Sequence, residues 1–592
     1  ARSASRGASS WPSEEGAPMA GLAGWIAKPG GAPEDRAMGA MLHALAHRGA
    51  AREGSCSFEN HHGGGYRVML GVRGSEPLYD PAAGVAVLLD GEIVNRAQLG
   101  EELRLHGYAF HGGSDAQLLA RAYQYWDKEV VGHLRGPFAA AIWDARKERL
   151  LIARDRFGER PLYLHEQAGG LYFASEIKAL LKLPGLEPKV DLRAVWDVLA
   201  FGYALSPKTL FAGIRKLMPG TYGVWQFGKL REARYWIPPD RVPRVQRRVA
   251  GDPVEAFLSA LDEVVKLHMT GEQGAPGLFL SGGVDSAVLL ALMSRHGTPV
   301  RTFCVGAEGG RASELRRAAR VAKHFGALHH ELVPTHQELA SSLAALVAQR
   351  DAPVPDPGDL AIHALGREAA RSVQCVLTGT GGDELLGGYP RHLAARLGWG
   401  TPGLHGSVRR ARAERERLSI LNLNGEDVLN GRPPFDADPR DSGLRRSLYF
   451  DQTSPLPDTL LERDDRLTLG TRAPFLDHRL AEQVSALPDS ARVRGLSTKW
   501  ILRRAARRLA PGSLAGRSRR LSVPSGAWLR GDMRDLLLDH LRGAGSLTRA
   551  YYRAPVLDRM LDEHLSGKQN HEKSLWTLLN IEIWHRTYRV SA

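Results

Sequence analysis

The run Ser281-Gly282-Gly283-Val284-Asp285-Ser286 has the composition of a loop that binds pyrophosphate. A short apolar stretch precedes it and a helical pattern follows, so backbone N–H groups and a helix N-terminus can surround one anion. Gly282 and Gly283 let the backbone approach closely. Asp285 is acidic where a phosphate is expected, which is unfavourable unless Mg²⁺ bridges the two. The alternative is a tight turn between a strand and a helix, with Asp285 or Ser286 as a simple cap.

A second glycine-rich run, from Thr378 to Glu384, also follows a strand-like segment. We expect both loops to lie at the same edge of one sheet. Asp285 and Asp383 would then hold Mg²⁺ between them and a triphosphate. The alternative for Asp383 and Glu384 is charge complementarity with the N-terminus of a helix.

A third run, Gly223 to Lys229, matches the first seven positions of a Walker-type phosphate loop. Leu230 stands where Ser or Thr must bind Mg²⁺, and the surroundings are typical of a β-hairpin. We therefore predict a structural turn at this position.

Two patterns along the chain predict the elements that position these loops. From about Gly21 to Tyr235, short strands with turn signals predominate, such as those at 84–89 and 149–154, which predicts a layered α+β domain. From 277 onward strands alternate with helices, a pattern that predicts a right-handed parallel sheet with ligands at the carboxyl ends of its strands. The expected strands lie near 277–280, 300–305, 330–333 and 375–378, and the expected helices near 285–293, 314–325, 336–349 and 359–371.

Length and composition limit the classes of protein. A chain of 592 residues is too long for one ordinary core, so two or more domains are expected. The net charge of +14 fits a solvated arginine-rich surface better than a nucleic-acid site, although arginines at 503–520 cluster where a polyphosphate could use them. We expect no nucleic-acid partner and, without a long apolar stretch, no membrane span. Three scattered cysteines predict a reducing, cytoplasmic compartment.

The same patterns divide the chain into segments. Residues 1–18 are expected to be a flexible extension or a tag remnant, and 19–236 the first domain. The Pro- and Arg-rich stretch 237–252 is predicted to be a linker, and 253–592 the second domain. Within the latter, the polar stretch 394–446 is predicted to be an insertion or a mobile connection.

From Met19 to about Trp584 the chain resembles the glutamine-dependent asparagine synthetases. The matching runs are Met19 to Gly24, His47-Arg48-Gly49, Asp90 to Asn95, Ser114-Asp115, Ala153 to Gly158, Ser281 to Ser286, Gly379 to Tyr389, Pro474 to His478 and Ser497-Thr498-Lys499. The resemblance implies an N-terminal Ntn-type, class II glutamine amidotransferase-like domain. It implies a C-terminal ATP-pyrophosphatase domain that forms an acyl-adenylate for attack by nitrogen.

The resemblance also implies a nucleotide site with ATP and Mg²⁺. It places Leu280, Val305, Thr378 and Gly379 along the nucleotide and assigns Asp285 and Asp383 to Mg²⁺ and pyrophosphate. The family's late lysine, which stabilises charge on the adenylate, falls near Arg519. An arginine keeps the charge and the phosphate contact but does not readily donate a proton.

The glutaminase half departs from the family pattern. The family's nucleophilic cysteine is here Ala20, and residues before Met19 would bury the amine that serves as base. The family's oxyanion-binding Asn is Asp90, whose charge would repel a developing oxyanion. With changes after Arg48 and a shortened stretch near Arg73, these departures favour natural loss of glutamine hydrolysis over a laboratory Cys-to-Ala replacement. The residues left as relics or fold-holders are Arg73, Asp90, Gly91, Glu92 and Asp115.

The synthetase half departs as well. The position that is commonly acidic in asparagine synthetases, and a tyrosine acting with a glutamate in β-lactam synthetases, is Thr380. Threonine has no useful pKa for removing an amine proton. Asp464 and Asp465 are candidates for a nearby base, with a solvated pair on a helix as the alternative. The segment from Leu467 to Ala473 is shorter than the family's, which predicts a reshaped acid pocket.

These observations favour an ATP-dependent, amide-bond-forming synthetase with a small carboxylic acid and ammonia or an amine as substrates. The alternatives are a glutamine-dependent asparagine synthetase captured as a Cys-to-Ala variant, a cyclase of β-lactam or lasso-peptide type in secondary metabolite biosynthesis, and a non-catalytic scaffold. A nucleic-acid-modifying enzyme is disfavoured because no RNA-binding motif is present. The sequence leaves the oligomeric state open, a homodimer included.

Overall fold

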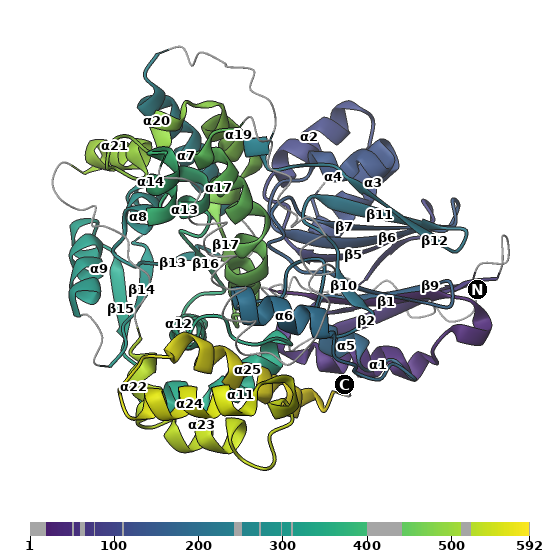
Figure 1. Ribbon diagram of the computed structural model, residues 1–592. Coiled ribbons are helices and arrows are strands. Elements are labelled where there is room, and N and C mark those ends of the chain that lie inside the picture. The colour runs from purple at the N-terminus through teal and green to yellow at the C-terminus, as the bar shows by residue number, and fades with distance from the viewer. Residues whose placement is uncertain are drawn as a thin grey trace.

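A computed structural model gives the fold of the chain, which consists of two lobes (Figure 1). It describes residues 19–49, 52–59, 65–75, 77–108, 110, 112–241, 251–270, 274–297, 299–308, 312–398, 441–510 and 523–590. The segment 1–18, most of the expected linker and most of the polar stretch 394–446 lie outside these residues.

The N-terminal lobe is a sandwich of two antiparallel six-stranded sheets. The first sheet, in spatial order, contains β10 (Ile214–Lys216), β8 (Tyr163–Gln167), β9 (Gly170–Ala174), β1 (Gly21–Ala27), β3 (Arg67–Arg73) and β2 (Glu53–Glu59). The second contains β12 (Lys229–Arg234), β11 (Thr221–Gln226), β7 (Arg149–Arg154), β6 (Phe138–Asp144), β5 (Val85–Gly91) and β4 (Leu78–Asp80). The hairpin of β11 and β12 carries the Gly223 to Lys229 run, so the predicted structural turn is confirmed.

Helices cover both outer faces of the sandwich, which explains why its central strands are apolar on both sides. In β5, Ala86 and Leu88 face the other sheet, whereas Val85 and Val87 face the helices. The helices over the second sheet are α2 (Arg96–Leu105), α3 (Asp115–Trp126) and α4 (Val130–His133). Those over the first are α1 (Asp35–Ala44), α5 (Ile177–Leu180) and α6 (Leu192–Phe201). The predicted layered α+β domain is confirmed.

The C-terminal lobe contains the predicted parallel sheet. Its five strands, in spatial order, are β15 (Leu328–Leu332), β14 (Arg301–Val305), β13 (Gly277–Phe279), β16 (Cys375–Leu377) and β17 (Gly470–Arg472). All neighbouring pairs run parallel. Successive residues of the central strands alternate between two cores, as Phe303 and Cys304 do in β14.

One face of this sheet is covered by helices near the glycine-rich loops. They are α7 (Pro253–Met269), α8 (Val284–His296), α9 (Ala312–His324), α19 (His478–Ala486), α20 (Asp489–Arg492) and α21 (Trp500–Leu509). The other face packs on α10 (His336–Ser341), α11 (Leu343–Arg350) and α12 (Gly358–Ala369). These bounds confirm the strands and helices expected between 277 and 378.

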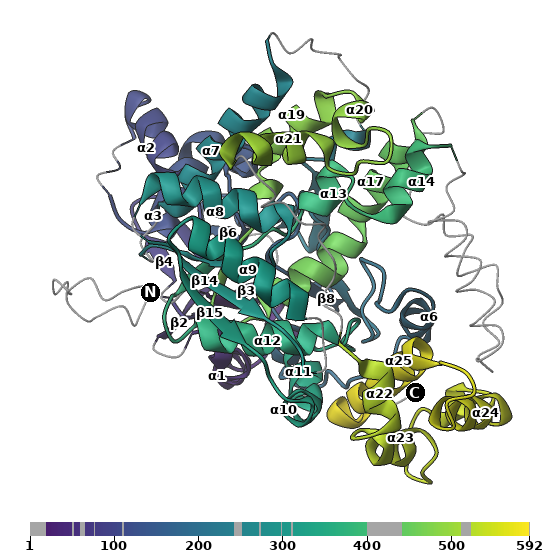
Figure 2. The ribbon, with the colours of Figure 1, turned by 90° about the vertical axis from the view of Figure 1, so that its left-hand side faces the viewer.

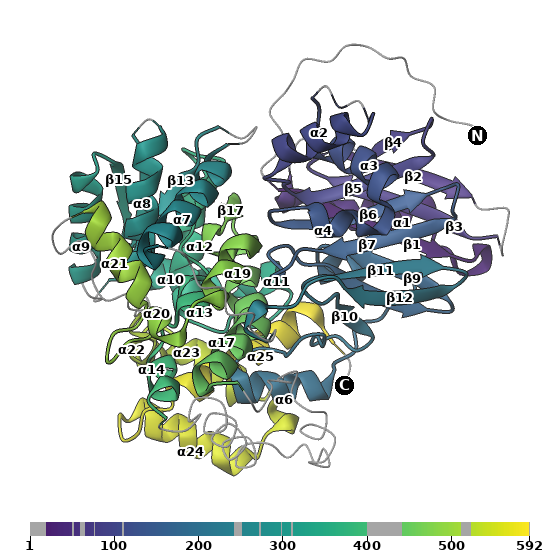
Figure 3. The ribbon, with the colours of Figure 1, turned by 90° about the horizontal axis from the view of Figure 1, so that it is seen from above.

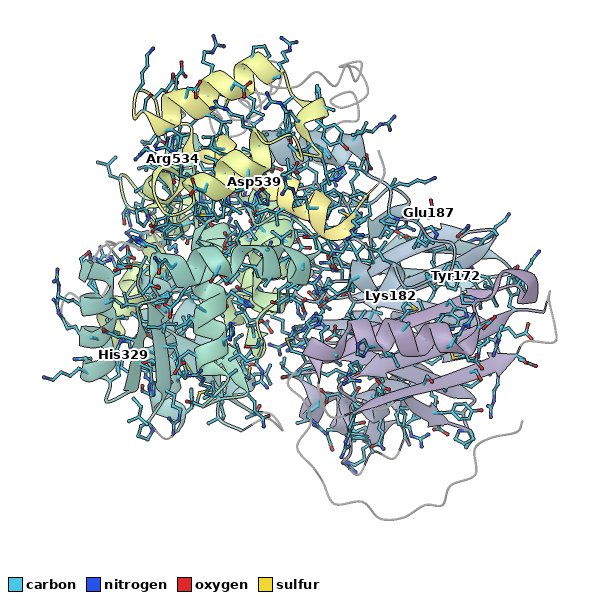
Figure 4. The ribbon with its side chains drawn as sticks, turned by 90° about the horizontal axis from the view of Figure 1, so that it is seen from below. Tyr172, Lys182, Glu187, His329, Arg534 and Asp539 are labelled. Carbon is cyan, nitrogen blue, oxygen red and sulfur yellow. The ribbon has the colours of Figure 1, made fainter. Side chains whose placement is uncertain are left out.

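A helical group follows at the C-terminus and lies beside both lobes (Figure 2). It consists of α22 (Ser525–Arg530), α23 (Arg534–Leu541), α24 (Ala554–Leu565) and α25 (Glu572–Tyr588). Figure 4 shows Arg534 and Asp539 on this group, far from Tyr172, which lies beside α1 in the sandwich. The ring of Phe211 packs 4.9 Å from that of Trp584 on α25. A single apolar cluster therefore runs from the first sheet through α6 and α25 to α12.

Between the second glycine-rich loop and β17 the chain forms a helical connection. It includes α13 (Gly382–Leu386), α14 (Pro390–Arg396), α17 (Gly443–Thr453), a π-helix (Leu456–Leu461) and α18 (Glu462–Asp465). Figure 3 shows α17 in the C-terminal lobe, beside α13 and α14. The described start of the expected linker, 237–241, is packed against the C-terminal lobe. Its buried Asp240 accepts a hydrogen bond of 2.7 Å from Arg492. No helix among the described residues is long and apolar enough to cross a bilayer.

Candidate functional site

The first glycine-rich loop connects β13 to α8 and closes on itself through its serines. The Ser281 backbone N–H donates to Ser286 Oγ at 3.2 Å, and the Gly283 N–H donates to Ser281 Oγ at 3.3 Å. Gly282 has a φ of +69°, and a Cβ there would lie 2.9 Å from the Ala318 backbone nitrogen. The glycine is therefore required both by the backbone conformation and by the approach of α9. Helix α8 begins at Val284, within this loop, so the positive end of its dipole lies at the loop.

The second glycine-rich loop lies directly beside the first, as expected. Strands β13 and β16 are neighbours, so both loops leave the sheet at the same edge. A Cβ on Gly382 would lie 2.6 Å from Asp285 Oδ1, and one on Gly379 would lie 3.1 Å from Asp285 Cβ. The two loops are thus in contact, and their glycines leave the space that the Asp285 carboxylate occupies.

Lys499 joins the two aspartates of these loops. Its Nζ lies 2.8 and 2.7 Å from the Asp285 carboxylate oxygens and 2.6 Å from Asp383 Oδ1. Burial acts to lower the pKa of Lys499, but the two carboxylates outweigh it and raise the pKa above its ordinary value. Lys499 has a φ of +51° immediately before α21. In the sequence, Lys499 stood out only as part of the matching run Ser497-Thr498-Lys499. Its position between the two loops could not be predicted from the spacing of residues along the chain.

The aspartate pair could hold a divalent cation. Two carboxylates beside a phosphate-binding loop suit Mg²⁺, which takes one or two carboxylates together with phosphate oxygens. Among the described residues, no group of three or more His, Cys, Asp or Glu side chains forms a metal site supplied by protein alone. Burial raises the pKa of Asp285, while Lys499 acts in the opposite direction.

The other residues expected along a nucleotide line the same edge. The buried Leu280 continues β13, and its N–H donates to the Phe303 carbonyl at 2.8 Å. Val305 ends β14 and is also buried. Thr378 Oγ1 is buried without a hydrogen-bond partner among the described residues. Arg519 lies outside the described residues.

Thr380 is brought together with one of the two candidate bases. Its hydroxyl donates to Asp464 Oδ2 at 2.7 Å. Arg463 holds the other oxygen, Asp464 Oδ1, with Nε at 2.8 Å and Nη2 at 2.6 Å. Asp464 is 4% exposed, so the alternative of a solvated pair is wrong. Asp465 does not reach Thr380 and instead points into the N-terminal lobe.

The Arg463 guanidinium is part of a longer chain of charges. Its Nη1 lies 3.8 Å from Asp359 Oδ1, and Asp359 Oδ2 lies 3.5 Å from Arg350 Nη1. Burial raises the pKa of Asp359 to about 6, against the effect of both arginines. On the other side of the site, burial and the Asp383 charge raise the pKa of Glu384 to about 7, and Glu384 accepts a hydrogen bond from the Tyr389 hydroxyl.

The expected glutamine pocket contains an arginine surrounded by carboxylates. Arg48 Nε donates to the Ala20 carbonyl at 2.7 Å, and its Nη2 donates to Asp90 Oδ2 at 2.9 Å. Asp90 Oδ2 also accepts from Ser175 Oγ at 3.0 Å. Burial raises the pKa of Asp90, and Arg48 acts to lower it. Ala20 is 8% exposed and has no group that could attack an amide.

The other residues predicted to belong to the glutamine site make contacts within the protein. Gly91 has a φ of +109°, and a Cβ there would lie 2.1 Å from the Pro137 carbonyl oxygen. Glu92 forms an ion pair with Arg472 on β17 of the other lobe. Asp115 begins α3 and accepts from the Ile93 N–H at 2.8 Å. Arg73 Nε donates to the Gly49 carbonyl at 2.6 Å, and its Nη1 pairs with Glu53.

Comparisons with known proteins agree with this architecture. Residues 256–586 match the asparagine synthase family, and residues 19–236 match the glutamine amidotransferase domain. A putative asparagine synthetase [glutamine-hydrolyzing] of Mycobacterium tuberculosis is 29% identical, over 96% of this chain and 97% of that protein. Asparagine synthetase [glutamine-hydrolyzing] 1 of Bacillus subtilis is 27% identical over 92% of each chain. Amidase chry2 of Gibberella zeae is 29% identical over 60% of this chain and 56% of its own.

An amidotransferase-type sandwich followed by a parallel sheet with two paired glycine-rich loops defines a ligase of the amidotransferase class. The chain belongs to the asparagine synthetase family. Members of this family are ATP-dependent ligases that act on carboxylates with glutamine or ammonia.

Proposed function

We propose that this protein is an ATP-dependent amide synthetase that activates a carboxylic acid as an acyl-adenylate. A carboxylate oxygen of the acid attacks the α-phosphorus of ATP, and pyrophosphate leaves. The loop at 281–286 and the N-terminus of α8 supply N–H groups and a positive dipole end for the pyrophosphate. An amine nitrogen then attacks the acyl carbon, and AMP leaves.

Asp285 and Asp383 are the residues that would hold Mg²⁺. When bound, the ion would offset the negative charge of the phosphates and of the two carboxylates. The Lys499 ammonium, within 2.8 Å of both side chains, supports a cation preference at this point. Thr378 and Gly379 border the same space, and the unpartnered Thr378 hydroxyl can donate to a nucleotide oxygen.

The Thr380–Asp464 hydrogen bond is the observation that carries the proposal for the second step. Thr380 belongs to the loop of Asp383, so this contact places a carboxylate at the edge where the adenylate would form. Arg463 donates to the other oxygen, so the Asp464 carboxylate is held from both sides. Asp464 can therefore accept the proton that the attacking amine loses, and Thr380 orients the carboxylate.

The nitrogen in this proposal is ammonia or an amine, including an amine within the acid substrate itself. Ala20 offers no thiol to release ammonia from glutamine, and Asp90 replaces the family's oxyanion donor. We therefore propose that the glutaminase half does not hydrolyse glutamine. ATP, Mg²⁺ and a small carboxylic acid are the ligands expected at the C-terminal site, and no nucleic acid is required.

Pyrophosphate exchange into ATP, screened over carboxylic acids, tests the first step. We expect exchange with at least one acid, and its loss in Asp383→Asn. In Asp464→Asn we expect exchange to persist while amide formation falls by a factor of about 10² or more, the usual contribution of a general base. Absence of exchange with every acid would favour the non-catalytic scaffold. Equal loss of both steps in Asp464→Asn would contradict the role of that carboxylate.

A further inference from the structure

The Arg48 guanidinium in the relic glutamine pocket has no free donor. Nε donates to the Ala20 carbonyl, Nη1 donates to Glu176 at 3.0 Å and Asp465 at 2.8 Å, and Nη2 donates to Asp90 and Asp465, each at 2.9 Å. A guanidinium has five N–H groups, and these five contacts use all of them. The side chain is fully buried. Arg48 is therefore committed to protein groups and cannot also bind a ligand carboxylate.

Asp465 is the C-terminal-lobe partner in this cluster, and both of its oxygens are held. Oδ2 accepts from Arg48 Nη1, whereas Oδ1 accepts from Arg48 Nη2 and from Arg160 Nη1, the latter at 3.0 Å. Arg466 Nη1 lies 3.4 Å from Oδ2. Arg48 and Arg160 both belong to the N-terminal lobe. A two-point contact with a planar guanidinium fixes the orientation of a carboxylate as well as its position.

The next residue toward the N-terminus, Asp464, is the proposed base. Asp464 and Asp465 lie on the single turn of α18, so fixing one side chain limits the movement of the other. The N-terminal lobe also holds the start of α18 and the π-helix before it, because the Tyr163 hydroxyl donates to Glu462 at 2.7 Å and Lys216 Nζ lies 3.1 Å from Asp458. The Thr380–Asp464 contact therefore depends on groups of the N-terminal lobe.

We propose that Arg48 is a positioning residue of the amide-forming site: through Asp465 it holds the Asp464 carboxylate against Thr380. This inference rests on the proposed role of Asp464. It gives this pocket of the N-terminal lobe a role in the second step, since Arg48 orients the helix that carries the proposed base. In the described part of the chain, the hydrogen bonds of Arg48 go to Ala20, Glu176, Asp90 and Asp465 and not to the adenylation loops, so we expect the first step not to depend on it.

The test compares Arg48→Lys with Arg135→Lys. Lysine keeps the charge but loses the planar two-point contact. Arg135 is a matched control because it is buried at the same boundary and binds Asp477 across it, with distances of 3.0 and 2.7 Å, away from α18. In Arg48→Lys we expect amide formation to fall about tenfold or more relative to pyrophosphate exchange. In Arg135→Lys we expect that ratio to remain as in the wild type.

Backbone amide hydrogen exchange on the same variants reports how firmly α18 and the second glycine-rich loop are held, and it needs no substrate. We expect faster amide exchange in peptides covering 456–466 and 378–386 in Arg48→Lys, and no change there in Arg135→Lys. Equal behaviour of the two variants in both measurements would overturn the inference. A wild-type protein without pyrophosphate exchange for any acid would refute the proposed synthetase, and the hydrogen-exchange comparison alone would then decide whether Arg48 positions this segment.

Discussion

Replacement of Lys499 by methionine tests the cation site between the two glycine-rich loops. The side chain is 2% exposed, and its ammonium contacts both Asp285 and Asp383. Methionine fills a similar volume but leaves these two carboxylates without their cation. Removing one partner of a buried ion pair typically costs about 3–5 kcal/mol, because the other charge stays buried and uncompensated. We expect the free energy of unfolding of the metal-free variant to fall by about that amount.

Mg²⁺ should restore the free energy of unfolding of Lys499→Met. It should raise the free energy of unfolding of the wild type much less, because the Lys499 ammonium competes there for the same carboxylate oxygens. The assay is chemical denaturation followed by tryptophan fluorescence, with EDTA and with millimolar Mg²⁺. Arg135→Met is the control, since it also leaves a buried carboxylate, Asp477, but only one and away from the loops. The reasoning is refuted if Lys499→Met is as stable as the wild type in EDTA, or if Mg²⁺ stabilises Arg135→Met equally.

Three further predictions concern other parts of the chain. Gly388→Ala would place its Cβ 1.6 Å from Asp383 Oδ1, so we expect the KM for ATP in pyrophosphate exchange to rise at least about tenfold; Gly39→Ala, where nothing lies within 4 Å of an added Cβ, should leave it unchanged. Ala20→Cys with a free N-terminus should release no glutamate from glutamine, because Asp90 stands at the position of the family's oxyanion-binding Asn. Release at a rate comparable to amide formation would show that the pocket still hydrolyses glutamine. Burial raises the pKa of Asp359 to about 6, above its unfolded value, so the folded state holds this proton more tightly. The free energy of unfolding of the wild type, relative to Asp359→Asn, should therefore fall by about 2 kcal/mol as pH rises from about 4 to about 6, and a pH-independent difference in urea titrations would contradict this assignment.

Local patterns in the sequence were sufficient to predict the strands and helices that carry the two glycine-rich loops. The alternation of strands and helices after Gly277 predicts a parallel sheet, and glycines directly after two strands predict loops at its carboxyl edge. The structure confirms both, because strand adjacency follows from short crossovers. The hairpin at Gly223 was likewise predictable from its turn residues.

Contacts between distant residues were not predictable in this way. Lys499 is 214 positions from Asp285, and Arg48 is 417 positions from Asp465, so no periodicity links them. The sequence placed Asp464 and Asp465 together as equal candidates. Only the packing of α18 between the lobes separates them, since one carboxylate turns toward Thr380 and the other toward Arg48.

The apolar cluster that joins the first sheet of the sandwich to α12 and α25 has a consequence for how this gene can change. If the N-terminal lobe were deleted, Trp584 and the side chains around it would be exposed to water, and the remaining chain would be prone to aggregate. Loss of a reaction in that lobe therefore does not make its coding sequence dispensable. We therefore expect substitutions around Ala20 to be tolerated better than truncations, which would expose this shared apolar surface.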